Sequence, residues 1–218
     1  MKDIKAAKAS NLLHRLISEG EHETQDFKFT VNDPRKIARS LSAFANNKGG
    51  RLLIGVDDNG KIKGVRNEED IYVVEAAASV YCKPSCNLEF TAYKEKGGAM
   101  VVCAEVCAAR KRPVFVKEEG ASLRAYYRVD DENIAVPQII VRAWQAQSDP
   151  ERQVVFGINP DKTSLLKALE ETPLTINALE RRVSMSSKRL EECIVELFSI
   201  GVIEFVYINR EFNLKVVT

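Results

Sequence analysis

Basic and aromatic side chains recur in this sequence at spacings that suit contact with nucleic acid. One pair of arginines lies four residues apart, which places both on the same side of a helix. Arg124, Tyr126 and Arg128 alternate along a strand, so one face would offer charge to phosphates and a ring to bases. The alternative is a solvated face whose charges pair with the acidic residues 130–132. We predict phosphate contacts from eight basic residues, namely Lys28, Arg35, Arg39, Arg110, Lys111, Arg112, Arg124 and Arg128.

A second group of candidate binding residues lies in the run Asn46-Asn47-Lys48-Gly49-Gly50. The Asn46 amide can satisfy backbone groups at the end of a helix. Gly49 and Gly50 permit the close approach of a phosphate or of another chain segment. The chain has no Gly-x4-Gly-Lys-Ser/Thr motif, which argues against a P-loop ATPase. We therefore predict that Asn46, Gly49 and Gly50 shape a binding loop, with a purely structural turn as the alternative.

The five cysteines raise the question of a metal site or a disulfide framework. An odd number in a chain of this length favours reduced thiols. Cys82-x3-Cys86 and Cys103-x3-Cys107 form two pairs near zinc-site spacing. The second pair falls in an apolar segment, where cysteine behaves as a small buried hydrophobe. We predict no metal site here, and neither His14 nor His22 has metal-ligand spacing.

The pattern of the first 145 or so residues predicts the α+β fold that would position these side chains. Alternation predicts a half-buried strand over 24–31, with Asp26 and Lys28 on a polar face available for chemistry. Asp33 and Pro34 predict the start of a helix, as its N-cap and its first turn. Further elements are expected as strands at 51–56, 61–65, 87–94, 99–106 and 123–129, and as helices at 34–45, 68–81 and 137–145. The sum is an α+β fold with a mixed or antiparallel sheet and packed helices.

The remainder of the chain has a different pattern. The segment 148–161 is rich in turn residues and is predicted to be a linker between a domain at 1–147 and a domain at 162–218. The second domain is expected to hold helices at 162–171, 176–183 and 187–199, then strands at 202–208 and 211–217. Three helices followed by a two-stranded hairpin are the order of a winged helix-turn-helix domain.

The charge balance constrains the partners of the two domains. The whole chain carries 32 basic and 31 acidic residues, which argues against a polybasic nucleic-acid coat protein. Residues 1–147 hold 23 basic and 20 acidic side chains, whereas residues 148–218 hold 9 and 11. The presumed recognition helix offers Lys188 and Arg189 to nucleic acid, but three glutamates accompany them. The first domain is therefore the better candidate for phosphate binding.

Two long sequence blocks carry a family resemblance. The first runs from Gly20 to Lys28, and the second, Leu41-Ser42-Ala43-Phe44-Ala45-Asn46-Asn47-Lys48-Gly49-Gly50 continuing to Asn59-Gly60, is the more specific. Together they closely resemble the AlbA_2 DNA-binding domain, also called Schlafen AlbA_2 or divergent AAA-4, over about residues 10–140. Tyr126-Tyr127-Arg128-Val129 is similar to the family's Tyr-Val-Arg strand, although Asp130-Asp131 replaces a common Gly-Ser. Bacterial members often join this domain to a winged helix, as transcriptional regulators.

The resemblance also implies an enzymatic alternative. Some Schlafen relatives cleave RNA with clustered carboxylates, and Glu21 and Asp26 have the spacing of the first two. Asp57 would be the third. Such a cluster could hold Mg²⁺ or Mn²⁺, which would activate water for attack on the phosphate. The family's ATP-binding label would fall on the Asn46–Gly50 loop.

The sequence as a whole predicts a nucleic-acid-binding protein, with DNA favoured over RNA, that acts as a transcriptional regulator and forms a homodimer. The alternatives are a metal-dependent endoribonuclease and a protein-interaction adaptor that binds no nucleic acid. No cofactor is expected outside the nuclease alternative. Apolar runs fall short of the roughly 18 residues of a membrane span, and the N-terminus lacks an apolar signal core. We therefore expect a cytoplasmic protein without a membrane partner.

Overall fold

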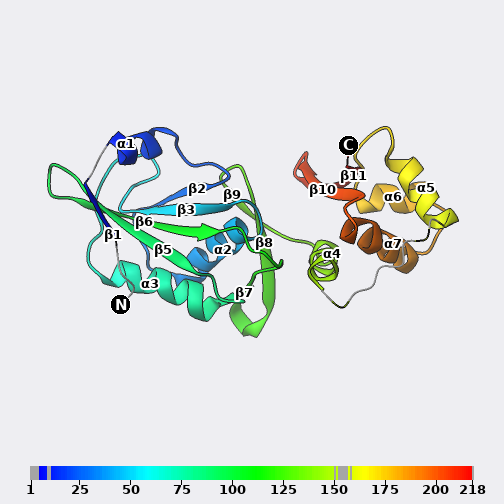
Figure 1. The fold of residues 1–218 in the computed structure, drawn as a ribbon, viewed down its shortest axis with the longest axis horizontal. Coiled ribbons are helices and arrows are strands. Elements are labelled where there is room, and N and C mark those ends of the chain that lie inside the picture. The colour runs from blue at the N-terminus through cyan, green and yellow to red at the C-terminus, as the bar shows by residue number, and fades with distance from the viewer. Residues whose placement is uncertain (1–4, 9–10, 150, 152–156, 158, 218) are drawn as a thin grey trace. The chain divides into compact units, whose positions relative to one another are not determined.

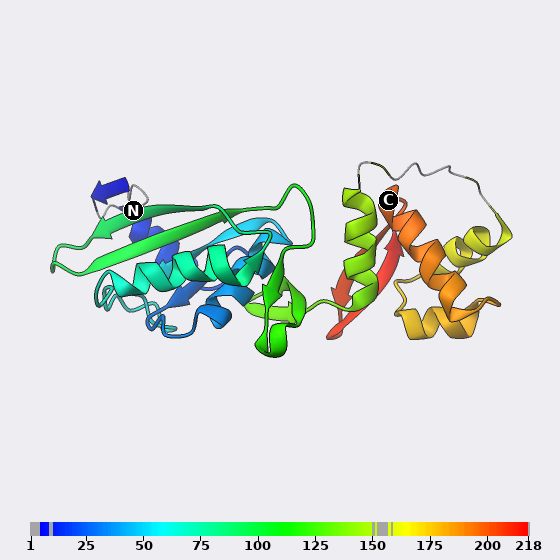
Figure 2. The same cartoon turned by 90° about the horizontal axis from the view of Figure 1, so that it is seen from below.

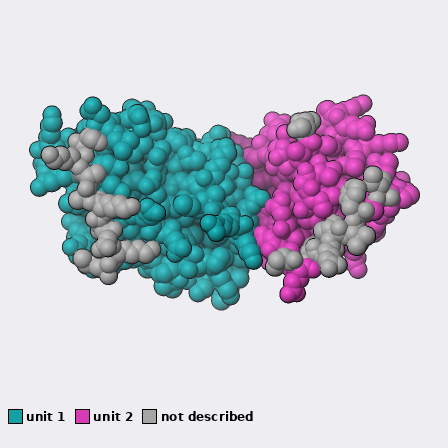
Figure 3. Space-filling model, in the orientation of Figure 1, with its two compact units in different colours: residues 1–136 teal, residues 137–218 magenta. Residues whose placement is uncertain are grey.

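The structure is a computed structural model, and two compact units make it up, residues 1–136 and residues 137–218 (Figure 3). It describes residues 5–8, 11–149, 151, 157 and 159–217. Each unit has its own buried apolar side chains, so each is described separately. No helix in the described part of the chain is long and apolar enough to cross a membrane.

The larger sheet of the first unit has five strands in the order β1-β5-β6-β3-β2 (Figure 1). Its two outer pairs, β1–β5 and β2–β3, are parallel, and its inner pairs are antiparallel. The strands are β1 (Lys5–Lys8), β2 (Gln25–Lys28), β3 (Gly49–Ile54), β5 (Leu88–Lys94) and β6 (Met100–Cys107). The prediction of an α+β fold with a mixed or antiparallel sheet and packed helices is confirmed, and this sheet is of the mixed type.

Helix α2 (Pro34–Ala45) packs both on this sheet and on a second, four-stranded sheet. Asp33 caps its start by accepting hydrogen bonds from the backbone N–H groups of Arg35 and Lys36. Its Leu41 and Phe44 side chains are fully buried. The second sheet has the order β4-β7-β8-β9, with β4 (Cys82–Lys83), β7 (Phe115–Lys117), β8 (Leu123–Val129) and β9 (Glu132–Ala135). Helix α2 is thus the centre of the first unit.

Two further helices cover the larger sheet (Figures 1 and 2). Helix α3 (Glu69–Ala76) continues into a π-helical turn (Ala77–Tyr81) and shares one core with α2. Helix α1 (Asn11–Ser18) buries Leu13 and Leu16 against a separate core that includes Phe27 and Leu53. Because alternate residues of a strand face opposite sides, the sheet has apolar side chains on both faces.

Two sequence expectations for the first unit differ from the structure. The strand predicted at 24–31 is limited to β2, and Gln25, Asp26 and Phe27 are all buried in it, so its polar face is not open. The strand predicted at 61–65 is reduced to a single bridge between Val56 and Ile62. Local alternation does not reveal that other elements cover a polar face.

The second unit contains four helices and a hairpin in the part of the chain that the structure describes. Asn159, Thr175 and Ser186 cap the starts of the last three helices with their side chains. The hairpin turns at Asn209 and Arg210, both with positive φ. The elements are α4 (Gln138–Ser148), α5 (Pro160–Leu169), α6 (Ile176–Arg182), α7 (Ser187–Ser199), β10 (Ile203–Ile208) and β11 (Glu211–Val216).

Helix α4 belongs to the second unit, whereas the sequence-based boundary places it in the first domain. It packs on α7 and buries most of its side chains, including Ile140 and Trp144. The predicted linker at 148–161 therefore lies within the second unit. Its residues 150, 152–156 and 158 lie outside the described residues, and Pro160 already begins α5.

Candidate functional site

A buried group of charged and polar side chains surrounds Asp26 on β2. Lys28 Nζ lies 2.9 Å from Asp26 Oδ1 and 2.8 Å from Oδ2, and Ser40 Oγ on α2 donates to Oδ2 at 3.1 Å. Arg128 Nη2 on β8 lies 3.5 Å from Asp26 Oδ1. Only 3% of Asp26 is exposed. Its carboxylate is therefore neutralised by two cations within the fold.

Glu21 completes this group from the loop before β2. Its Oε1 accepts a hydrogen bond from the backbone N–H of Phe27 at 2.8 Å. Burial, and then the neighbouring Asp26 carboxylate, raise the pKa of Glu21 to about 7. Burial opposes ionisation of Asp26 as well, but hydrogen bonding with Glu21 and the charge of Lys28 lower its pKa overall. Below about pH 7 the pair therefore holds one proton, which lies mainly on Glu21.

Arg128 is a structural residue of this group. Only 1% of it is exposed, and its guanidinium lies 5.2 Å from the centre of the Phe44 ring. It donates to the backbone carbonyls of His22 and Gln25, each at 3.4 Å, and to Asn133 Oδ1 at 2.9 Å. These bonds satisfy carbonyls beside the outer edge of β2. A buried Arg128 cannot reach a phosphate in this structure.

The three carboxylates of the nuclease alternative do not fit a divalent metal site. Both Asp26 oxygens are held by Lys28. Asp57 Oδ1 accepts backbone N–H groups of its own turn, from Asn59 at 3.1 Å and Lys61 at 2.9 Å. Asp57 also lies five residues beyond Leu52, the register partner of Asp26. Among the described residues, no three Asp, Glu, His or Cys side chains group as a metal site would require.

Asn46 joins α2 to the second sheet. Its Nδ2 donates to the carbonyls of Val114 and Tyr126, both at 2.9 Å, and to Ser42 Oγ at 3.2 Å. Its Oδ1 accepts the backbone N–H of Val114 at 2.7 Å. Asn46 is fully buried. These contacts support the structural alternative for this residue.

The glycines after Asn46 make room for the chain itself. Gly49 has φ +81°, and a Cβ there would lie 2.8 Å from the carbonyl oxygen of Val106. A Cβ on Gly50 would lie 2.5 Å from the ring of Phe44. The close approach predicted for this loop is therefore made by β6 and α2 of the same unit.

A groove of about 660 Å³ lies beside these glycines. Lys48 and Arg51 line it, but Lys48 Nζ lies 2.6 Å from Glu23 Oε2, and Arg51 Nε donates to Gln25 Oε1 at 2.8 Å. Two carboxylates also line it, those of Glu89 and Glu105, from directly opposed positions of β5 and β6. This mixture of charges does not favour a phosphate.

Most of the basic residues predicted in the first unit are held by contacts within the fold, and the others are exposed. Lys28 and Arg128 belong to the Asp26 group, and Arg39 forms two hydrogen bonds with Glu118, at 2.8 and 2.7 Å. Arg35 lies 3.6 Å from Glu119 and over the Tyr81 ring. Arg112 is partly buried and donates to the carbonyl of Asn46 at 3.4 Å. The exposed members of the predicted set are Arg110, Lys111 and Arg124.

The face of β8 that carries Arg124, Tyr126 and Arg128 turns toward α2. Tyr126 is 7% exposed, and its hydroxyl donates to Glu118 at 2.5 Å. The prediction that these residues share one face agrees with the strand, but only Arg124 remains open to solvent.

The two basic residues predicted to bind nucleic acid from α7 also differ from each other in exposure. Lys188 is exposed. Arg189 Nε lies 2.8 Å from Asp161, and its Nη1 lies 3.3 Å from Glu192. Sequence reasoning missed two neighbouring exposed arginines, Arg181 and Arg182, in the last turn of α6.

The first unit is thus an α+β domain in which a central helix packs on two sheets and a polar group closes the edge of β2. The model of the Schlafen, AlbA_2 family matches residues 21–137, and the chain belongs to this family. AlbA_2 domains are a nucleic-acid-binding family. This result confirms the family resemblance found in the sequence.

Comparison with other known proteins adds little. No curated protein matches the chain. Among solved structures, the DIP2311 protein from Corynebacterium diphtheriae is similar, with 20% sequence identity and a TM-score of 0.45. The similarity covers 88% of this chain and 34% of that one, so this chain spans about a third of the other protein.

Proposed function

We propose that this protein is a DNA-binding transcriptional regulator whose first unit contacts phosphates through Arg110, Lys111 and Arg124. The observation that carries the proposal is the state of Arg110 and Lys111. Both are exposed in the loop between β6 and β7, and no ion pair holds either of them in the described part of the chain. An exposed cation without a carboxylate partner gains more from a phosphate than a cation already paired with one.

The second unit supports the proposal by its order of elements. Helices α5, α6 and α7 precede the β10–β11 hairpin, which is the order of a winged helix-turn-helix domain. We therefore assign it as the winged helix of the regulator. A regulator of this type commonly reads two half-sites as a homodimer, which is the assembly we propose.

A salt series of fluorescence anisotropy measurements tests the proposal on the full chain, with duplex DNA and structured RNA as separate probes. Replacing Arg110, Lys111 and Arg124 by Gln should reduce the slope of log K against log salt by about 3, because three phosphate contacts are lost. A matched control replaces Lys61, Lys94 and Lys96, which are exposed elsewhere in the first unit, and should leave the slope unchanged.

Three outcomes contradict the proposal. If the chain binds neither duplex DNA nor structured RNA at the lowest salt, the result favours the adaptor alternative. An equal loss of slope in the control variant would mean that general charge is responsible. Cleavage of RNA with Mg²⁺ or Mn²⁺ that is lost in Glu21→Gln would replace a regulator with the nuclease alternative.

A further inference from the structure

Helix α7 is covered along two sides within the second unit. Leu190, Ile194 and Leu197 form one fully buried stripe on it. Val195 lies away from this stripe, and only 6% of it is exposed. Helix α4 packs along α7, and Arg142 of α4 forms an ion pair with Glu191. A helix that reads a DNA groove needs a free face along its length, and α4 reduces that face.

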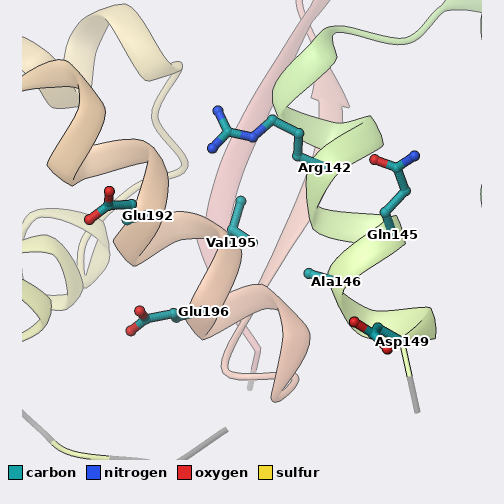
Figure 4. Close-up of a pocket in the computed structure, with 7 residues that line it drawn as sticks. All are labelled: Arg142, Gln145, Ala146, Asp149, Glu192, Val195 and Glu196. Carbon is teal, nitrogen blue, oxygen red and sulfur yellow. The ribbon is translucent and has the colours of Figure 1, made fainter. Parts of the chain in front are cut away.

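The remaining open side of α7 carries glutamates that are already paired with basic side chains. A groove of about 350 Å³ lies between α4 and α7, lined by Ala146 and Val195 between the two helices (Figure 4). Glu192 and Glu196 point to the side of α7 away from α4 (Figure 4). Asp149 adds a third carboxylate to the groove lining. Arg142 also lines the groove, but it is paired with Glu191, as Arg189 is with Glu192 at 3.3 Å and Lys162 with Glu196 at 2.7 Å. Among the described residues of this groove, no cation is left free for a phosphate.

Positive charge in the second unit gathers instead where α6 ends and α7 begins. Residues 176–190 carry four basic side chains and one acidic side chain, whereas the whole of residues 137–218 carries 10 basic and 11 acidic ones. Arg181 and Arg182 end α6, and Lys188 lies in the first turn of α7. All three are exposed, and none has an ion pair among the residues that the structure describes. We call these three residues the basic corner.

We propose that the second unit binds the sugar-phosphate backbone of duplex DNA through the basic corner, and that α7 does not enter a groove. This inference rests on the proposed function, because it places the phosphate contacts of the same regulator. It follows that the second unit contributes affinity without base readout, since phosphate contacts carry no sequence information directly.

The test uses the full chain and duplex DNA in anisotropy across a salt series. Replacing Arg181, Arg182 and Lys188 by Gln should lower the slope of log K against log salt by about 3. The control variant replaces Arg142, Lys167 and Lys215 by Gln, which removes the same charge from other parts of the second unit, and should leave the slope unchanged. Urea unfolding of both variants checks that each retains its fold.

A second variant tests the exclusion of α7. Glu192→Gln with Glu196→Gln should change the affinity for duplex DNA by less than about twofold, because these side chains lie outside the phosphate contacts. A rise of about tenfold or more would place the open side of α7 against DNA and overturn the inference.

The outcomes separate this inference from the proposed function. If the wild-type chain binds DNA and the basic-corner variant keeps the full slope, the inference fails while the regulator proposal stands. If the wild-type chain binds no DNA at the lowest salt, both the regulator proposal and this inference fail. If the two triple variants lose slope equally, the basic corner has no special role and the inference is overturned.

Discussion

At the scale of single residues, Asn46 shows how a polar side chain can be essential to the fold. Three of its hydrogen bonds join the end of α2 to Val114, just before β7, and to Tyr126 of β8. Asn46→Ala would remove the acceptor of the buried Val114 backbone N–H and one donor from the carbonyl of Tyr126, whereas the Val114 carbonyl would keep Ser42 Oγ at 2.7 Å. We expect the free energy of unfolding to fall by about 3 kcal/mol, because each unsatisfied buried group costs roughly 1–3 kcal/mol. Urea denaturation followed by circular dichroism measures this change.

Asn47→Ala is the matched control for that experiment. Asn47 is partly buried and donates to Glu23 and to the carbonyl of Arg128, each at 3.0 Å. Its removal should cost clearly less than the removal of Asn46, because Glu23 is partly exposed and keeps Lys48 as a partner, so only the Arg128 carbonyl loses a partly buried hydrogen bond. An Asn46→Ala variant as stable as wild type would show that the amide is not structural. Asn46 would then again be a candidate binding residue.

Glu21 provides a prediction about pH. Its pKa is raised to about 7 by burial and by Asp26, against 4.5 for the ordinary side chain. Between these values the native state holds more protons than the unfolded state, so this group lowers stability as pH rises. Wild type should therefore lose more stability than Glu21→Gln when the pH is raised from 5 to 8. Paired urea titrations at both values measure the difference, and Asp58→Asn, an exposed carboxylate, is the control. Parallel curves for wild type and Glu21→Gln would contradict the assignment.

Residue types and spacing identified side chains that are important in the structure. They did not predict the partners of those side chains. Arg39 was predicted to bind phosphate, but its partner Glu118 lies 79 residues away in the sequence. Arg128 was placed on the correct face of its strand, yet that face is covered by α2. Whether a cation is free depends on such distant carboxylates and covering elements, which local spacing does not reveal.

At the scale of elements, periodicity and capping predicted several segments closely. The predicted helix at 34–45 matches α2, and the predicted strand at 123–129 matches β8. The missed elements are short, as in β9 (Glu132–Ala135) and α1 (Asn11–Ser18). Such segments form because tertiary partners cover them, and a single-sequence pattern carries little of that information.

Helix α4 is the element whose assignment most affects the architecture. A fragment of residues 137–218 should unfold cooperatively, because it keeps the α4–α7 packing. A fragment of residues 149–218 exposes Val195 and loses the Arg142–Glu191 ion pair. We expect it to be less stable by about 2–3 kcal/mol, the scale of burying one or two apolar side chains. Urea unfolding of the two fragments measures this difference. Equal stability would contradict the assignment of α4 to the second unit.

At the scale of the whole molecule, a net charge of +1 conceals two separate groups of exposed cations. One group is Arg110, Lys111 and Arg124 of the first unit, and the other is the basic corner of the second. If both bind one duplex, their counterion release adds, because each phosphate contact contributes about −0.9 to the slope of log K against log salt. The slope expected for the full chain is then about −5, against about −3 for residues 1–136 alone.

The affinities should differ as well as the slopes. Once the first unit has bound, the second unit binds at a high effective concentration, so the full chain should bind more tightly than either fragment by at least about 100-fold. Anisotropy of the full chain, of residues 1–136 and of residues 137–218 on one long duplex measures all three. A full-chain slope equal to that of residues 1–136 would show that the second unit does not contact DNA. The second unit would then serve docking or dimerisation despite its winged-helix order of elements.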